Sequence, residues 1–571
     1  MHKVKEILKI LAVYISILLG CVATYVFYAH GKIVVEQVFF LDETVLQMHW
    51  VKKIVLIIIL TSLFLFLAIS LLKSAKIKFT ISVIAVLFFT YVFSVFDYIR
   101  YNIAFSDFYE KEYKPFIMEK SSFPKNKRNL IIIYLESMEQ DYAEKNVKPY
   151  LDELQKNNTG LFGFKQLKTT NMTIGSQFAG LCGLPLKAIR LNTDFYNFKP
   201  NIICVPDILK KAGYNLSYLK AAKLSFSGAE MFAKQHSFDN VKGYNELAPV
   251  LRKKFSDIEG NMFGGLKDRI LFEAAKSELL NLKQPFMLTL TTLDMHHIPN
   301  YFVDEGCETK FGDVRDAVAC VDKNVKDFIE WLKKQDFYKN TTILLLGDHI
   351  GSLESMLYSS SASTYNTIIN SANKKPLHKH SWTTYDLAPT ILNSLGIDIN
   401  HLGLGRSLYK DEKTLFEKYG NVFEFKTMAR NKLYNELSKN NMAKYSYKPY
   451  DLGKILTNKQ ISKYIDLGNN NYCNSATIMS FNIGQNFSKD ITLKANISVL
   501  AYKYDILLNG NIIFSHNDKK NKTTKINIPI KKEWLKNDGK ILIEAIFEQN
   551  INTDNIDGIC FDNFVLQEQK Q

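Results

Sequence analysis

The sequence predicts an α/β domain that follows a set of transmembrane helices and precedes a β-rich domain. Before residue 97, apolar residues form stretches long enough to cross a bilayer as helices. Between 128 and 410, short apolar runs alternate with helical patterns, which is typical of an α/β sheet protein. After 456 the pattern changes to strand-like runs separated by turn residues. A chain of 571 residues is too long for one compact core, so several folded units are expected.

Three apolar stretches, 7–28, 54–72 and 79–96, predict transmembrane helices. The first also has the length of a signal peptide, but no small-residue cleavage site follows it and two more stretches come after it. Lysines flank this region at positions 3, 5 and 9 and again at 73, 76 and 78. The positive-inside rule makes these flanks cytoplasmic, although Lys52 and Lys53 weaken the contrast. Three crossings then place the chain after residue 97 outside the cytoplasm.

The cysteines agree with that location. Six of the seven lie after residue 97, an even number on the side where disulfides persist, and Cys21 lies inside the first apolar stretch. None has the C-x-x-C spacing typical of zinc sites. Proximity in the sequence suggests the pairs Cys182–Cys204, Cys307–Cys320 and Cys473–Cys560, although spacing alone does not determine connectivity.

Composition divides the chain into five parts. These are a membrane anchor (1–96), a juxtamembrane helix and linker (97–127), an α/β domain (128–410), a connecting segment (411–455) and a β-rich accessory domain (456–571). Within the α/β domain, apolar runs predict buried parallel strands at 129–135, 286–292 and 341–346. Amphipathic patterns predict helices at 205–212 and 314–333.

The β-rich domain contains five predicted strand runs, at 475–482, 491–500, 504–514, 523–530 and 540–548. Asn509-Gly510 is a hairpin-turn signal, so the third run is expected to fold back on itself. A small β-sandwich that binds carbohydrate fits this pattern, and so does a purely structural appendage.

The net charge of +15 and the pI near 9.1 are compatible with nucleic acid, anionic lipid or acidic polysaccharide as a partner. A lysine-rich solvated surface explains the charge equally well. The chain has no helix-turn-helix, zinc-finger or RNA-binding signature, so a nucleic-acid partner is not predicted.

Polar side chains follow three of the predicted strands. Glu136 follows the first strand, Asp348 and His349 follow the last, and the 286–292 strand is followed by Asp294, His296 and His297. Because the carboxyl ends of parallel strands meet at one edge of a sheet, these groups are expected to converge. Carboxylates and imidazoles at one edge predict a site for a divalent metal ion.

A hydroxyl nucleophile is available in the polar loop that begins at Thr169. Thr173 lies where this loop enters a predicted helix, and backbone N–H groups at a helix N-terminus favour a phosphate. Threonine is also a common N-cap, and spacing alone favours that structural role.

An ordered set of motifs between 128 and 410 resembles the sulfatase-like membrane transferases of the alkaline phosphatase superfamily. The similarity is greatest to phosphoglycerol transferases that modify osmoregulated periplasmic glucans, and lipoteichoic acid synthases are more distant. The motifs are Tyr134-Leu-Glu-Ser137, Met172-Thr-Ile-Gly-Ser176, Cys182-Gly-Leu-Pro185, Cys204-Val-Pro-Asp-Ile-Leu209, Leu224-Ser-Phe-Ser-Gly-Ala-Glu230, Phe238-Asp239, Thr292-Leu-Asp-Met-His-His297, Gly347-Asp-His349 and Gly403-Leu-Gly-Arg-Ser407.

The resemblance implies a metal site and a nucleophile. Its metal ligands fall on Glu136, Thr173, Asp348 and His349, with Thr173 also the nucleophile, and the ion is expected to be Mn²⁺ or Mg²⁺, with Zn²⁺ an alternative. A histidine near the transferred phosphate falls on His296 or His297, because Ile298 separates this pair from the proline that directly follows it in the family. Arg406 is either a contact to an anionic head group or a structural residue.

The resemblance further implies a multi-pass enzyme of the cell inner membrane whose catalytic domain faces the periplasm. It would transfer phosphoglycerol from phosphatidylglycerol to a glycan or glycolipid through a phosphothreonine intermediate and release diacylglycerol. The alternatives are a phosphoethanolamine transferase acting on lipid A, lipooligosaccharide or glycan, and a non-catalytic glycan-binding or assembly protein. A sulfatase is disfavoured because Cys182-Gly-Leu-Pro-Leu lacks the C-x-P-x-R pattern that sulfatases need. The acceptor and the oligomeric state are not indicated.

Overall fold

The computed structural model describes two compact units. It describes residues 2–30, 49–116, 123–187, 198, 202–260, 264–296, 301–351 and 362–437, apart from 143, 145, 376 and 379, and the backbone of the strands between 464 and 568. The first unit is built on residues 1–187 and 198–439, and the second contains 440–571. The first unit therefore extends past the predicted end of the α/β domain at residue 410.

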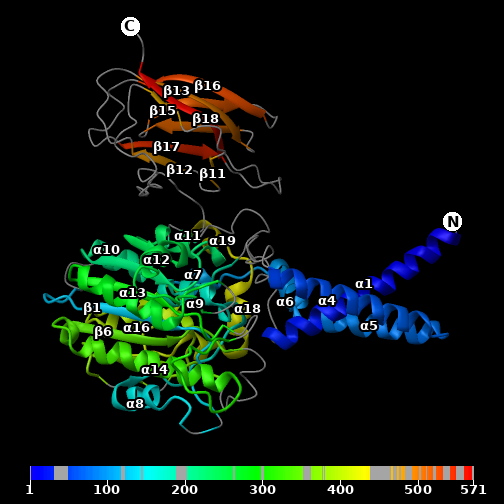
Figure 1. Ribbon diagram of the computed structural model, residues 1–571, viewed down its shortest axis with the longest axis horizontal. Helices are drawn as coiled ribbons and strands as arrows, with labels where there is room; N and C mark the ends of the chain where they lie inside the picture. Colours follow the sequence, from blue (N-terminus) through cyan, green and yellow to red (C-terminus); the bar gives the residue numbers. More distant parts are fainter. Residues whose placement is uncertain are drawn as a thin grey trace. The chain divides into compact units, whose positions relative to one another are not determined.

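Three N-terminal helices lie side by side in the first unit, with α1 packed against both others (Figure 1). They are α1 (His2–His30), α4 (His49–Ser70) and α5 (Ala75–Val92). Lys9–Phe27 of α1 and the whole of α5 are long and apolar enough to cross a membrane, and few of their side chains are buried. Exposed apolar helices of this length indicate membrane anchoring. The described apolar part of α4, Val55–Ser70, is shorter, so a third crossing stays a prediction.

The helix expected over 79–96 ends earlier, at Val92. Ser94 adopts a left-handed backbone conformation with φ of 50°, which breaks the helix. A new helix, α6 (Val95–Ile103), begins directly after this break, and α7 (Phe108–Glu112) follows it. The juxtamembrane helix predicted after residue 97 is therefore present as two short helices.

A seven-stranded mixed sheet forms the centre of the first unit, in the order β2-β7-β6-β1-β5-β3-β4. The strands β6, β1, β5, β3 and β4 are parallel, and β7 is antiparallel to both of its neighbours. Their bounds are β1 (Asn129–Leu135), β2 (Thr159–Gly160), β3 (Asn215–Lys220), β4 (Asn240–Lys242), β5 (Phe286–Thr291), β6 (Thr341–Gly347) and β7 (Asn366–Ile369). The three strands predicted from apolar runs are thus confirmed as β1, β5 and β6.

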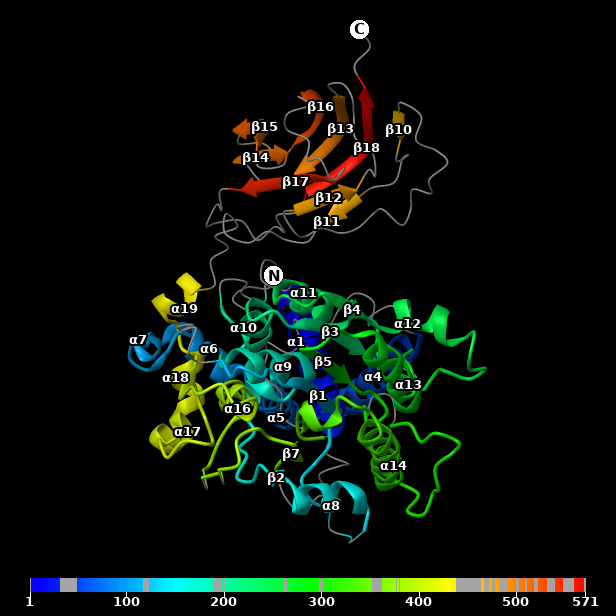
Figure 2. The same ribbon diagram turned by 90° about the vertical axis from the view of Figure 1, so that its left-hand side faces the viewer.

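Helices cover both faces of this sheet, with α9, α10 and α16 on one side and α13 and α14 on the other (Figure 2). Side chains of β1 alternate between the faces. Ile131, Ile133 and Leu135 join the core cluster that contains α13 and α14, whereas the Tyr134 hydroxyl points toward Gly180 of α9. Burial on both faces explains why β1 reads as a continuous apolar run.

The first unit also contains eleven further described helices, five single-turn helices and a short hairpin. The helices are α8 (Pro149–Asn157), α9 (Thr173–Cys182), α10 (Val205–Lys211), α11 (Ala229–Gln235), α12 (Tyr244–Leu251), α13 (Asp268–Asn281), α14 (Val314–Lys333), α16 (Leu387–Ser394), α17 (Leu415–Tyr419), α18 (Phe423–Met428) and α19 (Lys432–Leu437). Single-turn helices are η2 (Lys168–Thr170), η3 (Phe226–Gly228), η4 (Tyr338–Asn340), η5 (Thr384–Asp386) and η6 (Gly420–Val422), and a small hairpin joins β8 (His401–Leu402) to β9 (Gly405–Arg406). The helices predicted at 205–212 and 314–333 are confirmed as α10 and α14.

The second unit consists of antiparallel strands in a five-stranded and a four-stranded sheet. The strands are β10 (Tyr464–Asp466), β11 (Tyr472–Asn474), β12 (Ile478–Asn482), β13 (Ile491–Val499), β14 (Lys503–Leu508), β15 (Asn511–Asn517), β16 (Lys522–Ile530), β17 (Lys540–Phe547) and β18 (Ile559–Glu568). β14 and β15 pair from Leu508 and Asn511 outward, so the predicted hairpin is confirmed. β18 pairs with β10, β11 and β13, and sequence reasoning missed it.

Two of the three predicted disulfides are present. Cys182 at the end of α9 is bonded to Cys204, the residue before α10, and Cys307 is bonded to Cys320 of α14. Cys473 and Cys560 lie opposite each other in the β11–β18 pairing. Their side chains are outside the described part of the chain, so the third disulfide stays a prediction.

Removal of the Cys182–Cys204 bond is expected to destabilise the first unit. A bond that closes a loop of this length, with a sequence separation of 22, contributes about 3 kcal/mol by restricting the unfolded chain. The double variant Cys182→Ala/Cys204→Ala should therefore lower the thermal unfolding midpoint of the full chain. Cys21→Ala, which removes a free cysteine, is the control. An unchanged midpoint in the double variant would show that the bond does not stabilise the fold.

Candidate functional site

Strand register places a row of polar residues along the carboxyl edge of the central sheet. Leu135 of β1 is paired with Gly347 of β6, so Glu136 and Asp348, the next residues, emerge side by side. On the other side of β1, Thr291 of β5 is paired with Lys220, the last residue of β3. The edge predicted from strand ends is therefore formed by neighbouring strands, as functional edges of α/β sheets are.

Glu136, Asp348 and His349 form a compact buried group at this edge. Their potential ligand atoms all lie within 4.8 Å of one another. His349 Nε2 is 3.4 Å from Glu136 Oε1 and 3.5 Å from Asp348 Oδ2. The predicted convergence of these three residues is thus present.

The hydrogen bonds of the group leave a position that suits a cation. His349 Nδ1 is 3.0 Å from the carbonyl oxygen of Ile350 and must donate to it, because a carbonyl only accepts. In the neutral imidazole, the Nε2 lone pair then faces two carboxylates. Asp348 Oδ2 is buried and accepts no hydrogen bond from the described residues. Two carboxylates and one imidazole nitrogen that converge beside a carboxylate oxygen without a donor among the described residues fit a divalent metal ion.

The pKa values in the metal-free group show the same excess of negative charge. Burial raises the pKa of Asp348 to about 6, and the negative charge of Glu136 contributes to this increase. Burial on its own would lower the pKa of His349, but the charges of Asp348 and Glu136 outweigh it and raise the pKa. Without a metal ion, protons therefore take the place of the missing positive charge.

Local backbone geometry holds the two carboxylates in place. Ser137 adopts a left-handed conformation with φ of 50°, and its N–H donates to Asp348 Oδ1 at 2.8 Å while its hydroxyl donates to Glu136 Oε1 at 2.9 Å. Gly347 allows the chain after β1 to pass close to β6, because a Cβ there would lie 2.1 Å from the carbonyl oxygen of Met138. A left-handed serine is uncommon and costs free energy, which the two hydrogen bonds offset.

Thr173 is the first residue of α9 and is directed at the acidic group formed by Glu136, Asp348 and His349. Its hydroxyl donates to Glu136 Oε2 at 3.2 Å. Thr173 is partly exposed, whereas Glu136 and Asp348 are buried, so Thr173 is the more accessible of these residues. The residue before it, Met172, occupies the N-cap position. Thr173 is therefore free of the capping role, and its oxygen lies beside both the helix N-terminus and the candidate ligands.

Lys220 is a functional candidate that sequence reasoning missed. Its residue is 4% exposed, and its ammonium donates to the carbonyl oxygen of Phe226 at 3.1 Å. Burial lowers the pKa of Lys220 to about 8, and the negative charges of Glu136 and Asp348 partly offset this. A buried lysine is rare without a reason. The sequence gives no local signal for this burial, because β3 is not a continuous apolar run.

Asp294 has a different environment from the one predicted for it. Its Oδ2 accepts the backbone N–H of Asp268 at 2.9 Å, and Asp268 Oδ1 accepts the N–H groups of Leu293 and Asp294. Burial raises the pKa of Asp268 to about 7 and also raises the pKa of Asp294. This pair holds the turn after β5, and Asp294 is not among the described residues grouped as potential metal ligands.

The remaining predicted site residues are placed as follows. His296 follows the turn after β5, is half-buried, and lies 6.5 Å between ring centres from Phe226, whose carbonyl binds Lys220. His297 lies outside the described residues. The guanidinium of Arg406 is buried and donates to Glu112 of α7 and to the carbonyl oxygens of Leu404 and Gly405. These contacts favour the structural role for Arg406, and head-group binding by it stays a prediction.

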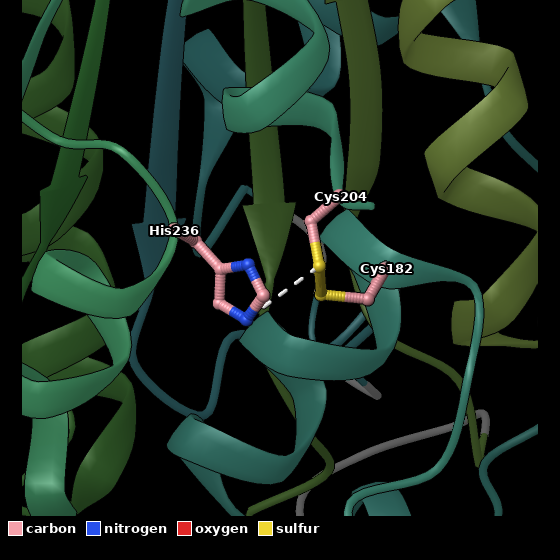
Figure 3. Close-up of side chains that lie close together, drawn as sticks. All are labelled: Cys182, Cys204 and His236. Carbon is pink, nitrogen blue, oxygen red and sulfur yellow. Dashed lines mark hydrogen bonds between the residues drawn. A yellow bond between two sulfur atoms is a disulfide. The ribbon is translucent and has the colours of Figure 1, made fainter. Parts of the chain in front are cut away.

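A second group of potential ligands, Cys182, Cys204 and His236, has a structural explanation (Figure 3). The two sulfurs form a disulfide, which leaves no thiolate to bind a metal. The ring nitrogens of His236 lie 2.8 Å from Asp207 Oδ2 and from the carbonyl oxygen of Phe198. This group joins the end of α9 to α10 and supports the helix that presents Thr173.

Part of the chain is similar in sequence to known proteins. Residues 128–397 match the model of the Sulfatase family. Phosphoglycerol transferase I of Escherichia coli O127:H6 is 32% identical over 328 residues, which cover 54% of this chain and 42% of that protein. The chain thus spans less than half the length of this curated relative.

Solved structures with similarity to the chain include members of the alkaline phosphatase superfamily. A protein of that superfamily from Vibrio parahaemolyticus is 18% identical, with a TM-score of 0.44, over 54% of this chain and 78% of that one. The lipoteichoic acid synthase LtaP from Listeria monocytogenes is 20% identical, with a TM-score of 0.41, over 53% and 79% of the two chains.

Metal binding is expected to stabilise the first unit through the acidic group. A divalent ion at about 100 times its Kd should raise the free energy of unfolding by about 2.7 kcal/mol, since it binds only the folded state. Asp348→Asn removes one ligand charge and should abolish the increase, as measured by thermal unfolding of chelator-treated protein with and without Mn²⁺. Asp398→Asn, a change at an exposed aspartate paired with Lys410, should keep it. Equal stabilisation of both variants would place the metal elsewhere.

Lys220→Met is expected to stabilise the metal-free protein at neutral pH. The pKa of Lys220 falls from 10.5 to about 8 on folding, so its charged form destabilises the folded state by about 3 kcal/mol below pH 8. Between pH 8 and 10.5 the unfolded state holds more protons, and the stability of the original protein rises relative to the variant. The thermal unfolding midpoints of the original protein and of Lys220→Met should therefore converge as the pH rises through this range. Lys334→Met, at an exposed position, is the control, and a pH-independent difference would refute the assignment.

Proposed function

We propose that this chain, whose residues 128–397 match the Sulfatase family model, is a membrane-anchored phosphotransferase that moves phosphoglycerol from phosphatidylglycerol to a glycan. The observation that carries the proposal is the position of Thr173, whose hydroxyl lies at a helix N-terminus and 3.2 Å from a carboxylate of the acidic group. The choice of phosphoglycerol is supported by the relative named phosphoglycerol transferase I, which is 32% identical to the matched part of the chain.

Glu136, Thr173, Asp348 and His349 are the proposed metal ligands, with Mn²⁺ or Mg²⁺ as the favoured ion and Zn²⁺ as the alternative. A divalent ion bound there would lower the pKa of the threonine hydroxyl and offset the negative charge of the phosphate. The fit rests on the buried Asp348 oxygen without a donor and on the imidazole nitrogen that faces two carboxylates.

The chain's own residues account for the two transfer steps. In the first, the Thr173 hydroxyl loses its proton to water, Thr173 Oγ forms a bond to the phosphorus of the lipid phosphodiester, and the bond to diacylglycerol breaks. The leaving oxygen takes a proton, for which His296 is the proposed donor. In the second, a sugar hydroxyl attacks the phosphothreonine and gives its proton to the same histidine, and the released Thr173 oxygen takes a proton back from water. Lys220, a buried cation on the same sheet edge, complements the phosphate charge.

Membrane anchoring fits a lipid donor. We propose three crossings, at 7–28, 54–72 and 79–92, and a catalytic domain on the periplasmic side of the inner membrane, in keeping with the lysine flanks. The Cys182–Cys204 and Cys307–Cys320 bonds support this side, because disulfides persist in oxidising compartments. The two sheets of the second unit are proposed to pack as a β-sandwich that binds the acceptor glycan.

The direct test is release of diacylglycerol by the purified full chain, reconstituted in phospholipid nanodiscs and assayed in a buffer with Mn²⁺. Phosphatidylglycerol should be cleaved in preference to phosphatidylethanolamine. Thr173→Ala should reduce the rate on the order of 10³-fold or more, since it removes the nucleophile. Thr173→Ser, which keeps a hydroxyl, should retain part of the activity.

The other outcomes separate the competing functions. Preference for phosphatidylethanolamine would make the chain a phosphoethanolamine transferase. No cleavage of either lipid by metal-loaded protein, with a glycan acceptor present, would contradict an enzymatic role and favour glycan binding or assembly. Full activity of Thr173→Ala would contradict the proposed nucleophile while leaving the activity in place.

A further inference from the structure

Helix α6 has an exposed apolar face directly after a membrane-spanning helix. Phe96, Ile99 and Ile103 are 65%, 47% and 77% exposed, and their spacing of three and four residues places them on one side of the helix. Phe105, just beyond the helix, is 71% exposed. Large apolar side chains gathered in this way on a surface mark a contact with something apolar.

The opposite side of α6 is fixed to the catalytic part of the first unit. Asp97 forms an ion pair with Lys168, and the Tyr101 ring packs against Phe425 of α18 with centroids 6.0 Å apart. The Arg100 guanidinium lies 4.2 Å from the centre of the same Phe425 ring. The apolar face is therefore held outward by contacts on the other face.

The position of α6 along the chain identifies what covers this face. Only Phe93 and Ser94 separate it from α5, the helix Ala75–Val92 that is long and apolar enough to span a membrane. A helix that begins where a span ends starts at the level of the lipid head groups. With one apolar face and one polar face, such a helix lies in the plane of the interface, with its apolar side chains among the upper acyl chains.

The contacts of α6 lead directly to the loop that carries Thr173. Lys168, the partner of Asp97, is the first residue of η2. The N–H of the next residue, Thr169, donates to Glu424 Oε1 at 3.0 Å, and Glu424 belongs to α18, which packs on α6. Gly175 of α9 packs closely against this loop, since a Cβ there would lie 2.9 Å from the carbonyl oxygen of Thr169.

We propose that the apolar face of α6, formed by Phe96, Ile99 and Ile103, binds the phospholipid surface beside α5 and thereby holds the Thr173 loop at the level of the lipid head groups. The membrane contact is independent of the proposed function, whereas its role in catalysis rests on it. A rigid helix at the interface would keep the nucleophile close to a phosphodiester that cannot leave the bilayer, which is a positioning role.

The contact is tested by a spin label on Ile103→Cys in the full chain, in a Cys21→Ala background and reconstituted in phospholipid nanodiscs. Power-saturation measurements with oxygen and a water-soluble nickel chelate should place the label roughly 5–10 Å below the phosphate level. The matched control is Leu280→Cys on α13, which is also apolar, 66% exposed and helical but has no adjacent span. The spin label at this control position should be accessible to the nickel chelate, as expected in water. A label on Ile103→Cys that also reports water would overturn the proposal.

The positioning role is tested by the variant Phe96→Ser/Ile99→Ser/Ile103→Ser. The expected result is a lower ratio of the rate on phosphatidylglycerol in nanodiscs to the rate on a water-soluble phosphodiester. An unchanged ratio, with the label in lipid, would overturn the positioning role and leave the contact established. If the original protein cleaves neither substrate, the proposed function fails, and the depth measurement still decides the membrane contact.

Discussion

The mutual repulsion of two buried carboxylates is the constraint on which the site depends. Glu136 and Asp348 emerge from adjacent parallel strands whose register pairs Leu135 with Gly347, so the fold itself forces the charges together. A pair of this kind is costly in a low-dielectric interior unless positive charge compensates it. His349 presents a nitrogen to both carboxylates, and Lys220 adds a cation from β3, but Asp348 Oδ2 still has no donor among the described residues. A divalent ion would resolve this imbalance, and the Thr173 hydroxyl, 3.2 Å from Glu136 Oε2, is the proposed oxygen ligand beside it.

The surrounding structure maintains this arrangement from two directions. On one side, the Cys182–Cys204 bond and His236 fasten the far end of α9, the helix that begins at Thr173. On the other, η2 and the loop before Thr173 are tied to α6 and α18 by ion-pair and hydrogen-bond contacts. The proposed nucleophile, Thr173, is thus placed between a covalently braced helix and a helix that follows a candidate membrane span. This arrangement suits a reaction whose donor is part of a bilayer.

Sequence patterns predicted those parts whose physical cause is local. The strands β1, β5 and β6 were predictable because burial on both faces makes them continuous apolar runs, and polar residues at their ends then marked the site. Other features depend on tertiary context. Strand β18 was missed because Asp562 and Asn563 interrupt its apolar pattern. The end of α5 was missed because a left-handed Ser94 has no reliable sequence signature. The burial of Lys220 depends on the residues that pack around it. The role of Asp294 also escaped prediction, because the backbone N–H that its carboxylate accepts belongs to Asp268, 26 residues earlier in the sequence.

The central claim is that Thr173, held by the acidic group and its metal ion, takes the phosphoryl group from the donor. It is tested most directly by acid-quenching the full chain with phosphatidylglycerol and Mn²⁺, without acceptor, and locating any modification by peptide mass spectrometry. The account predicts that the peptide containing Thr173 gains one phosphoglycerol group less water, and that chelator prevents this. Modification of another residue, or turnover of the lipid without any modified peptide, would contradict it.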